Sequence, residues 1–494
     1  MKTDSIYPIN GQSDNLAGND LLPAVNEATT VLAQYVTDSA TGNIPAAQIK
    51  PLHENMALLN AEKLIQEGGL KDGNLSHFVK TYVDHSTRLH HPKYLAHQTA
   101  SPNTAAAIAD LMHGAINNPG SLYEMGPTTA TLEYVTLNWM LRKIGWPEEP
   151  LGDHNTSEIP DPNTHGAGVL VNGGSLANLV ALLAARSAIA PDAWENGNPS
   201  NLKVLVPASS HYSVARALSI MGLGKQAMIS IPVDANERII PAALQEKVTQ
   251  ALQQGHQIMA VVANACTTGT GLFDPLEDIA SICEQHSLWL HVDACHGGVH
   301  LMSNKHKHLI KGAERADSLV WDAHKMMRVS GLCAAVLVRR ATHLQNAFQQ
   351  QASYLFYGSE SPGIDFIYRS VECTKNALGT KLFMALAWEG EQAIADYVDS
   401  RIDATHQFYD IISTRDGFSC PYQPESNILC FRYGDDDALQ IEIREALLNE
   451  GLFHLSSATV NGKRYLRFSV MTPQTDDIVV TELLDTIEKR WPLD

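Results

Sequence analysis

The sequence predicts an α/β protein in which a mostly parallel sheet is covered by helices on both faces. Between residues 91 and 382, short apolar runs alternate with helical stretches, as strands alternate with crossover helices in such a sheet. Apolar residues recur at helical spacing in 21–35 and 57–65. Strand-like runs at 427–432 and 465–470 follow the α/β region. We therefore expect a helical N-terminal segment (1–90), a large α/β domain (91–382) and a small α+β C-terminal domain (383–494).

The first strand of the large domain is predicted at Gly168-Val-Leu-Val. The turn Asn172-Gly-Gly-Ser175 follows it and opens a helical stretch from Leu176 to Arg186. Free backbone amides and the positive dipole end at the start of a helix bind anions such as phosphate, and Ser175 would add a hydroxyl. The alternative is an ordinary glycine turn, since many helices begin in this way without binding a ligand.

The next predicted strand, Leu202-Lys-Val-Leu-Val-Pro, ends shortly before Ser209-Ser-His211. An imidazole at a strand end could stack on a flat ring. A loop histidine without a ligand is the competing interpretation.

Two later apolar runs turn polar at their ends and predict buried strands that carry charged groups to one sheet edge. The run 287–292 ends at Asp293, and the run 318–321 leads through Asp322-Ala-His to Lys325. Pyridoxal 5′-phosphate (PLP) acts as an electron sink when its ring nitrogen stays protonated and its aldehyde is bonded to a lysine. Separately, Asp293 could be a turn residue and Lys325 a surface charge; together and in this order they favour a PLP site.

These motifs resemble those of the PLP-dependent group II amino-acid decarboxylases, the family of glutamate, cysteine-sulfinate, aromatic amino-acid and 2,4-diaminobutyrate decarboxylases. The resemblance covers nearly the whole chain. It implies fold type I of the PLP-dependent enzymes and release of CO2 and an amine from an L-amino acid. The matching stretches are 91–94, 123–133, 173–178, 210–213, 267–270, 291–294 and 324–325.

The resemblance also implies roles for individual residues. Lys325 would hold the cofactor covalently, Asp293 would pair with its ring nitrogen, and His211 would stack on the ring. The phosphate would be held by Gly174, Ser175 and His324, and Thr268 would place a hydroxyl near the cofactor.

Substrate residues are implied less directly. Arg467 matches an arginine that contacts the substrate carboxylate in several relatives, and its planar fork suits that task. His97 and Gln98 lie near the place of a substrate-binding glutamine in the glutamate and cysteine-sulfinate enzymes. We therefore expect an acidic amino acid as substrate, although Arg467 could instead be a structural strand residue. The alternatives are 2,4-diaminobutyrate, an aromatic amino acid, another PLP reaction such as transamination, or a relative that has lost catalysis.

Three places depart from the pattern of the family or are hard to align. Asp322 stands where many relatives have asparagine, and it brings a negative charge towards the phosphate. Cys295 stands where small residues are common. The tyrosine that protonates the reaction intermediate is expected within 352–369, and we assign Tyr368 to that role, with Tyr354 and Tyr357 as packing residues.

Composition agrees with a small-molecule enzyme. The net charge of −19 argues against a nucleic-acid partner and an anionic membrane surface. The first residues lack an apolar signal region, and the seven cysteines include no Cys-x-x-Cys pair, which predicts a cytoplasmic protein with reduced thiols. The histidine pairs His90-His91 and His306/His308 have no further ligands at metal-binding spacing, so we expect no metal. By resemblance, residues 1–90 wrap a partner subunit in a homodimer with active sites at the interface.

Overall fold

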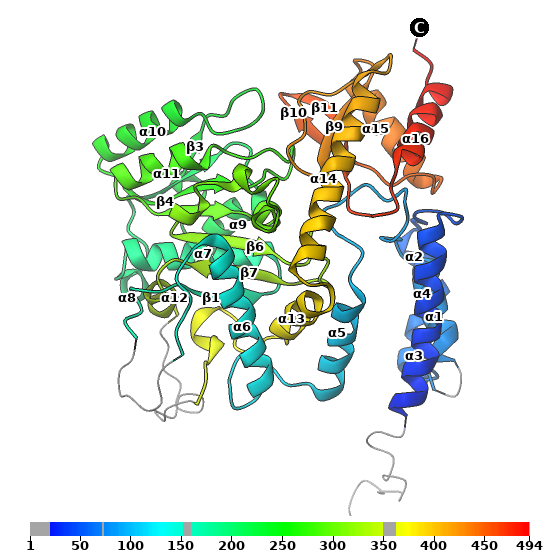
Figure 1. Cartoon of the computed structure of the whole chain (residues 1–494), viewed down its shortest axis with the longest axis horizontal. Coiled ribbons are helices and arrows are strands. Elements are labelled where there is room, and N and C mark those ends of the chain that lie inside the picture. The colour runs from blue at the N-terminus through cyan, green and yellow to red at the C-terminus, as the bar shows by residue number, and fades with distance from the viewer. Residues whose placement is uncertain (1–19, 72–73, 152–159, 349–361, 494) are drawn as a thin grey trace, which may run out of the picture. The chain divides into compact units, whose positions relative to one another are not determined.

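A computed structural model describes residues 20–71, 74–151, 160–348 and 362–493 (Figure 1). The chain divides into two compact units. The smaller unit contains Met1–Tyr94 with Arg444–His454, and the larger contains Leu95–Ile443 with Leu455–Asp494.

The smaller unit is built mainly of helices. As the periodicity predicts, α1 begins at Leu21, and it extends to Thr41. The helix expected at 57–65 is instead two helices, α2 (Leu52–Leu59) and α3 (Ala61–Glu67), because Asn60 has a left-handed backbone with φ of 49° that ends one and begins the other. Helix α4 (Leu75–Asp84) packs against α1, and the Glu27 carboxylate of α1 accepts a hydrogen bond from the Ser76 amide at 2.8 Å.

A seven-stranded sheet forms the core of the larger unit. The β2, β3, β4, β5 and β6 strands run parallel to one another, as predicted for this region. The prediction of an apolar sheet strand at 168–171 is also confirmed, but β7 runs antiparallel to both β1 and β6. In order across the sheet the strands are β1 (Ala167–Val171), β7 (Ala334–Val338), β6 (Ser318–Asp322), β5 (Leu290–Asp293), β4 (Gln257–Asn264), β2 (Leu202–Pro207) and β3 (Met228–Ile231).

Helices cover this sheet on both faces, which is why every residue of β1, β5, β6 and β7 is buried although successive side chains point to opposite faces. Helix α7 packs along β1, β7, β6, β5 and β4, while α6 packs against β1 and β7. Within the described residues, each helix is too short or too polar to cross a bilayer. The helices of this part of the chain are α5 (Thr104–Ile116), α6 (Pro127–Ile144), α7 (Gly174–Ile189), α8 (Ala193–Asn196), α9 (Tyr212–Ile220), α10 (Pro241–Gln253), α11 (Leu276–Gln285), α12 (Thr342–Ala347) and α13 (Leu378–Glu389).

A smaller antiparallel sheet follows later in the chain, in the order β10-β11-β9-β8. Its β10 and β11 strands form a hairpin through Asn461-Gly462, whose φ angles of 49° and 77° suit the Asn-Gly turn that matches strand twist. The proposed domain boundary at 383 stays a prediction. The elements here are α14 (Glu391–Ser413), β8 (Phe418–Ser419), β9 (Ile428–Tyr433), α15 (Asp437–Asn449), β10 (Ser456–Val460), β11 (Lys463–Ser469) and α16 (Asp477–Arg490).

Candidate active site

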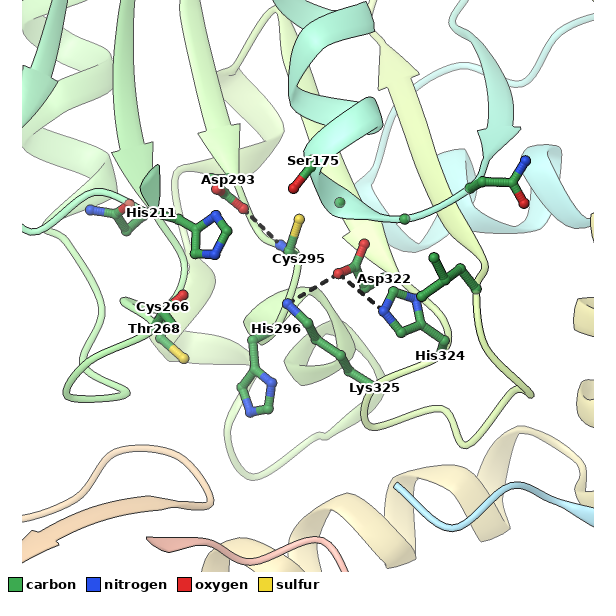
Figure 2. Close-up of a pocket in the computed structure, with 15 residues that line it drawn as sticks. Ser175, His211, Cys266, Thr268, Asp293, Cys295, His296, Asp322, His324 and Lys325 are labelled. Carbon is green, nitrogen blue, oxygen red and sulfur yellow. Dashed lines mark hydrogen bonds and ion pairs between the residues drawn. The ribbon is translucent and has the colours of Figure 1, made fainter. Parts of the chain in front are cut away.

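A cavity of about 280 Å³ lies where the parallel strands of the large sheet end (Figure 2). Asp293 is the last residue of β5, Asp322 is the last residue of β6, and the two strands are neighbours. This is the edge at which open α/β sheets bind ligands. All seven residues expected at the cofactor line this one cavity: Gly174, Ser175, His211, Thr268, Asp293, His324 and Lys325.

Lys325 follows β6 and reaches back to its end. Its Nζ lies 3.0 Å from Asp322 Oδ2, and His324 Nε2 lies 3.8 Å from the same oxygen, so both side chains converge on this carboxylate (Figure 2). Burial alone would lower the pKa of the Lys325 ammonium, but the carboxylates of Asp322 and Asp293 raise that pKa above its ordinary value. Lys325 is therefore a charged ammonium in this arrangement.

Asp293 is held from two directions. Its Oδ2 accepts a hydrogen bond from Asn178 Nδ2 at 2.9 Å, and its Oδ1 accepts one from the Cys295 amide at 3.2 Å. Burial opposes the charged form, but the hydrogen bond from Asn178 and the charge of Lys325 outweigh it and lower the pKa of the Asp293 carboxyl. A buried, charged carboxylate can keep a pyridine nitrogen protonated.

His211 caps the start of α9 with its ring. Its Nδ1 accepts a hydrogen bond from the Ser213 amide at 3.3 Å and lies 2.7 Å from Ser213 Oγ. Burial lowers the pKa of the imidazole, and the nearby Asp293 charge opposes this only in part. His211 is therefore neutral near pH 7 and presents a flat ring to the cavity, as a ring-stacking residue requires.

The start of α7 also lines the cavity. The first helical hydrogen bonds are donated by the amides of Leu176 and Ala177 to the Gly173 carbonyl, so the amides of Gly174 and Ser175 lie ahead of that ladder. A Cβ built on Gly174 would lie 2.6 Å from Cys295 Sγ and 2.9 Å from Asp322 Oδ2. Only glycine therefore allows the helix start to approach the ends of β5 and β6 this closely.

Together these groups fit a phosphorylated pyridine aldehyde. The α7 start offers backbone amides and a hydroxyl for a phosphate, Asp293 offers a charge for a ring nitrogen, and Lys325 offers an amine for an aldehyde. Asp322 alone is discordant: its Oδ1 is buried without a hydrogen-bond partner among the described residues, and its charge lies against Gly174. Asp322, which departs from the pattern of the family, thus lies beside the turn at Gly174 that is expected to bind the phosphate.

The predicted substrate residues lie outside the residues that line the cavity. Arg467 in β11 is buried, and its guanidinium donates to the carbonyls of Thr268 at 2.7 Å, Gly269 at 3.1 Å and Ala96 at 3.2 Å. It thus links the chain just before His97 to the loop that carries Thr268.

Two further expected residues are also away from the cavity lining. Gln98 is partly buried, and its Nε2 has no hydrogen-bond partner among the described residues. Tyr368 lies in a short 3₁₀ helix, Phe366–Arg369. Tyr354 and Tyr357 lie outside the described residues.

The structure adds residues to which sequence reasoning gave no role. Asn178 and His291 belong to motifs that were noted, but no pattern shows that they meet. His296, three residues after Asp293, also lines the cavity, and burial followed by the Lys325 charge holds the pKa of its imidazole well below the usual range. Nothing in the local sequence shows that its side chain faces the site.

Comparison with known proteins gives a consistent result. Residues 53–434 match the family model described as pyridoxal-dependent decarboxylase conserved domain. The human protein named acidic amino acid decarboxylase GADL1 is 29% identical over 486 residues, which span 94% of this chain and 90% of the relative.

Solved structures share the fold across almost the whole chain. The crystal structure of mouse CSAD has a TM-score of 0.86 and 23% identity, and covers 96% of this chain and 99% of that one. The glutamate decarboxylase domain of a diaminobutyrate-pyruvate transaminase and L-2,4-diaminobutyrate decarboxylase from Vibrio parahaemolyticus has a TM-score of 0.79 and 25% identity, with 96% of each chain covered.

Proposed function

Because this chain belongs to the pyridoxal-dependent decarboxylase family and is a PLP-dependent amino-acid decarboxylase, we propose that its substrate is an acidic amino acid: glutamate, aspartate or cysteine sulfinate. The observation that carries the proposal is the similarity along 94% of the chain to a relative named for acidic amino acids.

Three cavity residues would carry the cofactor. When bound, PLP supplies the electron sink that accepts the electrons left by departing CO2. Lys325 would provide the amine for covalent attachment, and Asp293 would keep the ring nitrogen protonated. His211 would lie against the ring and help to hold it, which restricts the orientation of the substrate.

The phosphate would be bound by the amides of Gly174 and Ser175, the Ser175 hydroxyl and the His324 imidazole. These groups line the same cavity as Asp293 and Lys325, so one cofactor could contact all of them. Thr268 would add a hydroxyl beside the ring, and its loop is held by the hydrogen bond from Arg467 to its carbonyl.

The acidic preference is supported by a cationic group one layer behind the cavity. Arg467 donates to the carbonyl of Thr268, a cavity residue, and to that of Ala96, which precedes His97 and Gln98. Gln98 Nε2, which has no hydrogen-bond partner among the described residues, is a donor suited to a carboxylate. We propose that these groups favour a substrate with a second acidic group.

2,4-Diaminobutyrate is the second candidate. The observation that favours it is the similarity, at 25% identity, to the decarboxylase domain from Vibrio parahaemolyticus. A diamine-forming substrate would need an acceptor for its second ammonium, and Asp322 is a buried carboxylate at the same cavity.

We also propose Tyr368 as the group that returns a proton to the substrate carbon. Burial, with a smaller contribution from Asp365, raises the pKa of its phenol, so the proton is retained at neutral pH. Replacing Tyr368 with phenylalanine should slow amine formation, measured as the rate of amine release. Unchanged rates and products would exclude it as the donor.

The assembly and location are proposed on separate grounds. A homodimer with active sites at its interface would cover the exposed apolar residues of α1, which include Leu32 and Val36, and those of α5. We propose a cytoplasmic location because the seven cysteines of the chain are all free thiols, which suits a reducing compartment.

The deciding experiment measures CO2 release and amine product from the purified PLP-loaded protein with glutamate, aspartate, cysteine sulfinate, 2,4-diaminobutyrate, lysine and aromatic amino acids. Release from an acidic substrate alone supports the proposal, and release only from a basic or aromatic one overturns it. Lys325→Ala should remove both turnover and covalent attachment of PLP, measured as cofactor mass retained on the protein after borohydride reduction. The matched control is Lys307→Ala, which changes an exposed lysine.

A further inference from the structure

Asn178 lies behind the cavity and joins two of its residues. It is on α7 and is 1% exposed. Its Nδ2 lies 2.9 Å from Asp293 Oδ2 and 2.9 Å from Ser213 Oγ, and Ser213 Oγ lies 2.7 Å from His211 Nδ1. One amide group therefore contacts the carboxylate directly and the imidazole through a hydroxyl.

A second chain of hydrogen bonds reaches Asn178 from the sheet. Asn178 Oδ1 lies 2.9 Å from His291 Nε2, and His291 Nδ1 lies 2.8 Å from Ser318 Oγ. Ser318 Oγ accepts a hydrogen bond from Trp289 Nε1 at 2.9 Å. His291 and Ser318 are in adjacent strands, β5 and β6, and both are completely buried.

The direction of every hydrogen bond in this network follows from its two fixed ends. An indole can only donate and a carboxylate can only accept. The Asp293 carboxylate requires the amide nitrogen of Asn178, so Asn178 Oδ1 faces His291 and accepts from His291 Nε2. Nδ1 of the neutral His291 is then an acceptor, and the Ser318 hydroxyl, which accepts from Trp289, donates to it.

The other arm determines the tautomer of His211. Asn178 Nδ2 donates its second proton to Ser213 Oγ, so the Ser213 hydroxyl proton is directed at His211 Nδ1. The Ser213 amide donates to the same nitrogen. Because Nδ1 is an acceptor in both contacts, the proton of the neutral imidazole must lie on Nε2.

We propose that Asn178 is a positioning residue for the decarboxylation: it orients the Asp293 carboxylate and, through Ser213, fixes His211 as the Nε2–H tautomer, while His291 holds Asn178 in register. The two cavity groups are thereby set together, one as a charged acceptor and the other as a neutral donor. This inference rests on the proposed roles of Asp293 and His211.

The test is Asn178→Asp in the holoenzyme, with the absorbance of the bound cofactor followed against pH. The change keeps the size of the side chain but places a second carboxyl group against Asp293, so the pair shares a proton and Asp293 loses charge. We expect a shifted absorbance–pH profile and a kcat lowered about 10–100-fold, the range seen for outer-shell partners in metal sites. KM should stay within about twofold, since no substrate contact is removed.

Asn138→Asp is the matched control. Asn138 is a buried asparagine of α6 whose side chain bonds the carbonyl and the amide of Glu149 at 3.0 and 2.9 Å, away from the cavity lining. It should lower the melting temperature without changing the absorbance profile. An Asn178→Asp variant that behaves like this control would overturn the proposal.

Ser213→Ala is the milder second variant and decides the matter if Asn178→Asp does not fold. It removes one hydroxyl from the His211 arm and leaves the Asp293 arm intact. We expect kcat to fall with an altered pH profile while the cofactor spectrum stays unchanged; an unaltered pH profile and kcat would refute the coupling to His211.

Asp293→Asn and His211→Phe separate this inference from the proposed function. If these two variants keep the spectrum and the activity of the parent protein, the cofactor roles themselves are wrong. If they lose activity while the Asn178 and Ser213 variants do not, only the positioning role fails.

Discussion

At the level of single residues, the chemistry of the site depends on which charges are balanced. Asp293 is compensated by Asn178 and the Cys295 amide, and its carboxyl pKa is lowered. Asp322 has Lys325 on one oxygen and no partner among the described residues on the other. Covalent attachment of a cofactor would take the Lys325 ammonium away from Asp322, which leaves that carboxylate facing a phosphate.

We expect Asp322→Asn to bind PLP about tenfold more tightly, equivalent to about 1.4 kcal/mol. The substitution removes a negative charge at the phosphate end and frees Lys325 from an ion pair that keeps it protonated. Equilibrium dialysis of the apoprotein against PLP measures the affinity. Asp317→Asn, which removes a carboxylate paired with Arg339 at the other end of the strand, should leave the affinity unchanged; weaker binding by Asp322→Asn would contradict the expectation.

His291 links the site to the pH dependence of stability. Burial lowers the pKa of its imidazole from 6.5 to about 4. Because the folded value lies below the unfolded one, the unfolded chain binds the proton first as the pH falls. The stability that neutral His291 contributes is therefore present above the unfolded pKa of 6.5 and is lost as the pH falls towards 4.

We expect the free energy of unfolding of the parent protein to fall about 2 kcal/mol more than that of His291→Gln between about pH 7 and about pH 5. Urea unfolding at the two pH values measures the difference. His308→Gln, at an exposed histidine, serves as the control and should follow the parent protein. Parallel losses in the parent and the His291 variant would show that the buried imidazole is not the cause.

At the level of elements, α7 connects the sheet to the proposed cofactor site. Its first turn carries the amides of Gly174 and Ser175, proposed to bind the phosphate, and its second turn carries Asn178, which bonds Asp293. This requires the helix to begin directly after β1, with Gly173 at a φ of 95° that favours glycine. The dipole of α7 is also directed at the phosphate end.

We expect Gly174→Ala to weaken PLP affinity by about 100-fold, because its methyl group would lie 2.6 Å from Cys295 Sγ and force the helix start away from the strand ends. Fluorescence titration of the apoprotein with PLP measures the loss. The matched control is Gly114→Ala in α5, where an added Cβ has no neighbour within 4 Å. Unchanged affinity in Gly174→Ala would mean that the phosphate does not bind at this turn.

At the level of the whole molecule, exposed apolar residues form a row on α5. On α5 they are Ile108, Leu111, Met112 and Ile116, which are 43%, 39%, 43% and 56% exposed and spaced to lie on one face. On a chain with a net charge of −19, a continuous apolar stripe is more typical of a specific protein interface than of a surface exposed to water. We assign this stripe to the proposed homodimer.

We expect the double variant Ile108→Asp/Met112→Asp to weaken the dimer about 100-fold or more, since each buried apolar side chain contributes about 1.5–3 kcal/mol. Light scattering over a dilution series measures the mass. Ile478→Asp, at a residue of α16 that is 76% exposed, should not change it. A double variant with the mass of the parent protein at every concentration would remove α5 from the interface.

The sequence by itself determined the fold class and the cofactor, and it predicted which residues would lie closest to that cofactor. These depend on local patterns: an apolar run that ends in a polar residue predicts a buried strand with its side chain at the sheet edge, and a glycine turn before a helix predicts an anion site. Asp293, Lys325 and Ser175 could therefore be found from their immediate neighbours.

Only the tertiary structure decided which distant residues meet. Asn178 and Asp293 are 115 positions apart, and Arg467 donates to a carbonyl 199 positions away. No local pattern encodes such pairs, because they arise from strand order and helix packing. The antiparallel β7, the break at Asn60 and the position of Arg467 behind the cavity were decided in the same way, by hydrogen-bond partners and backbone angles that depend on the assembled fold.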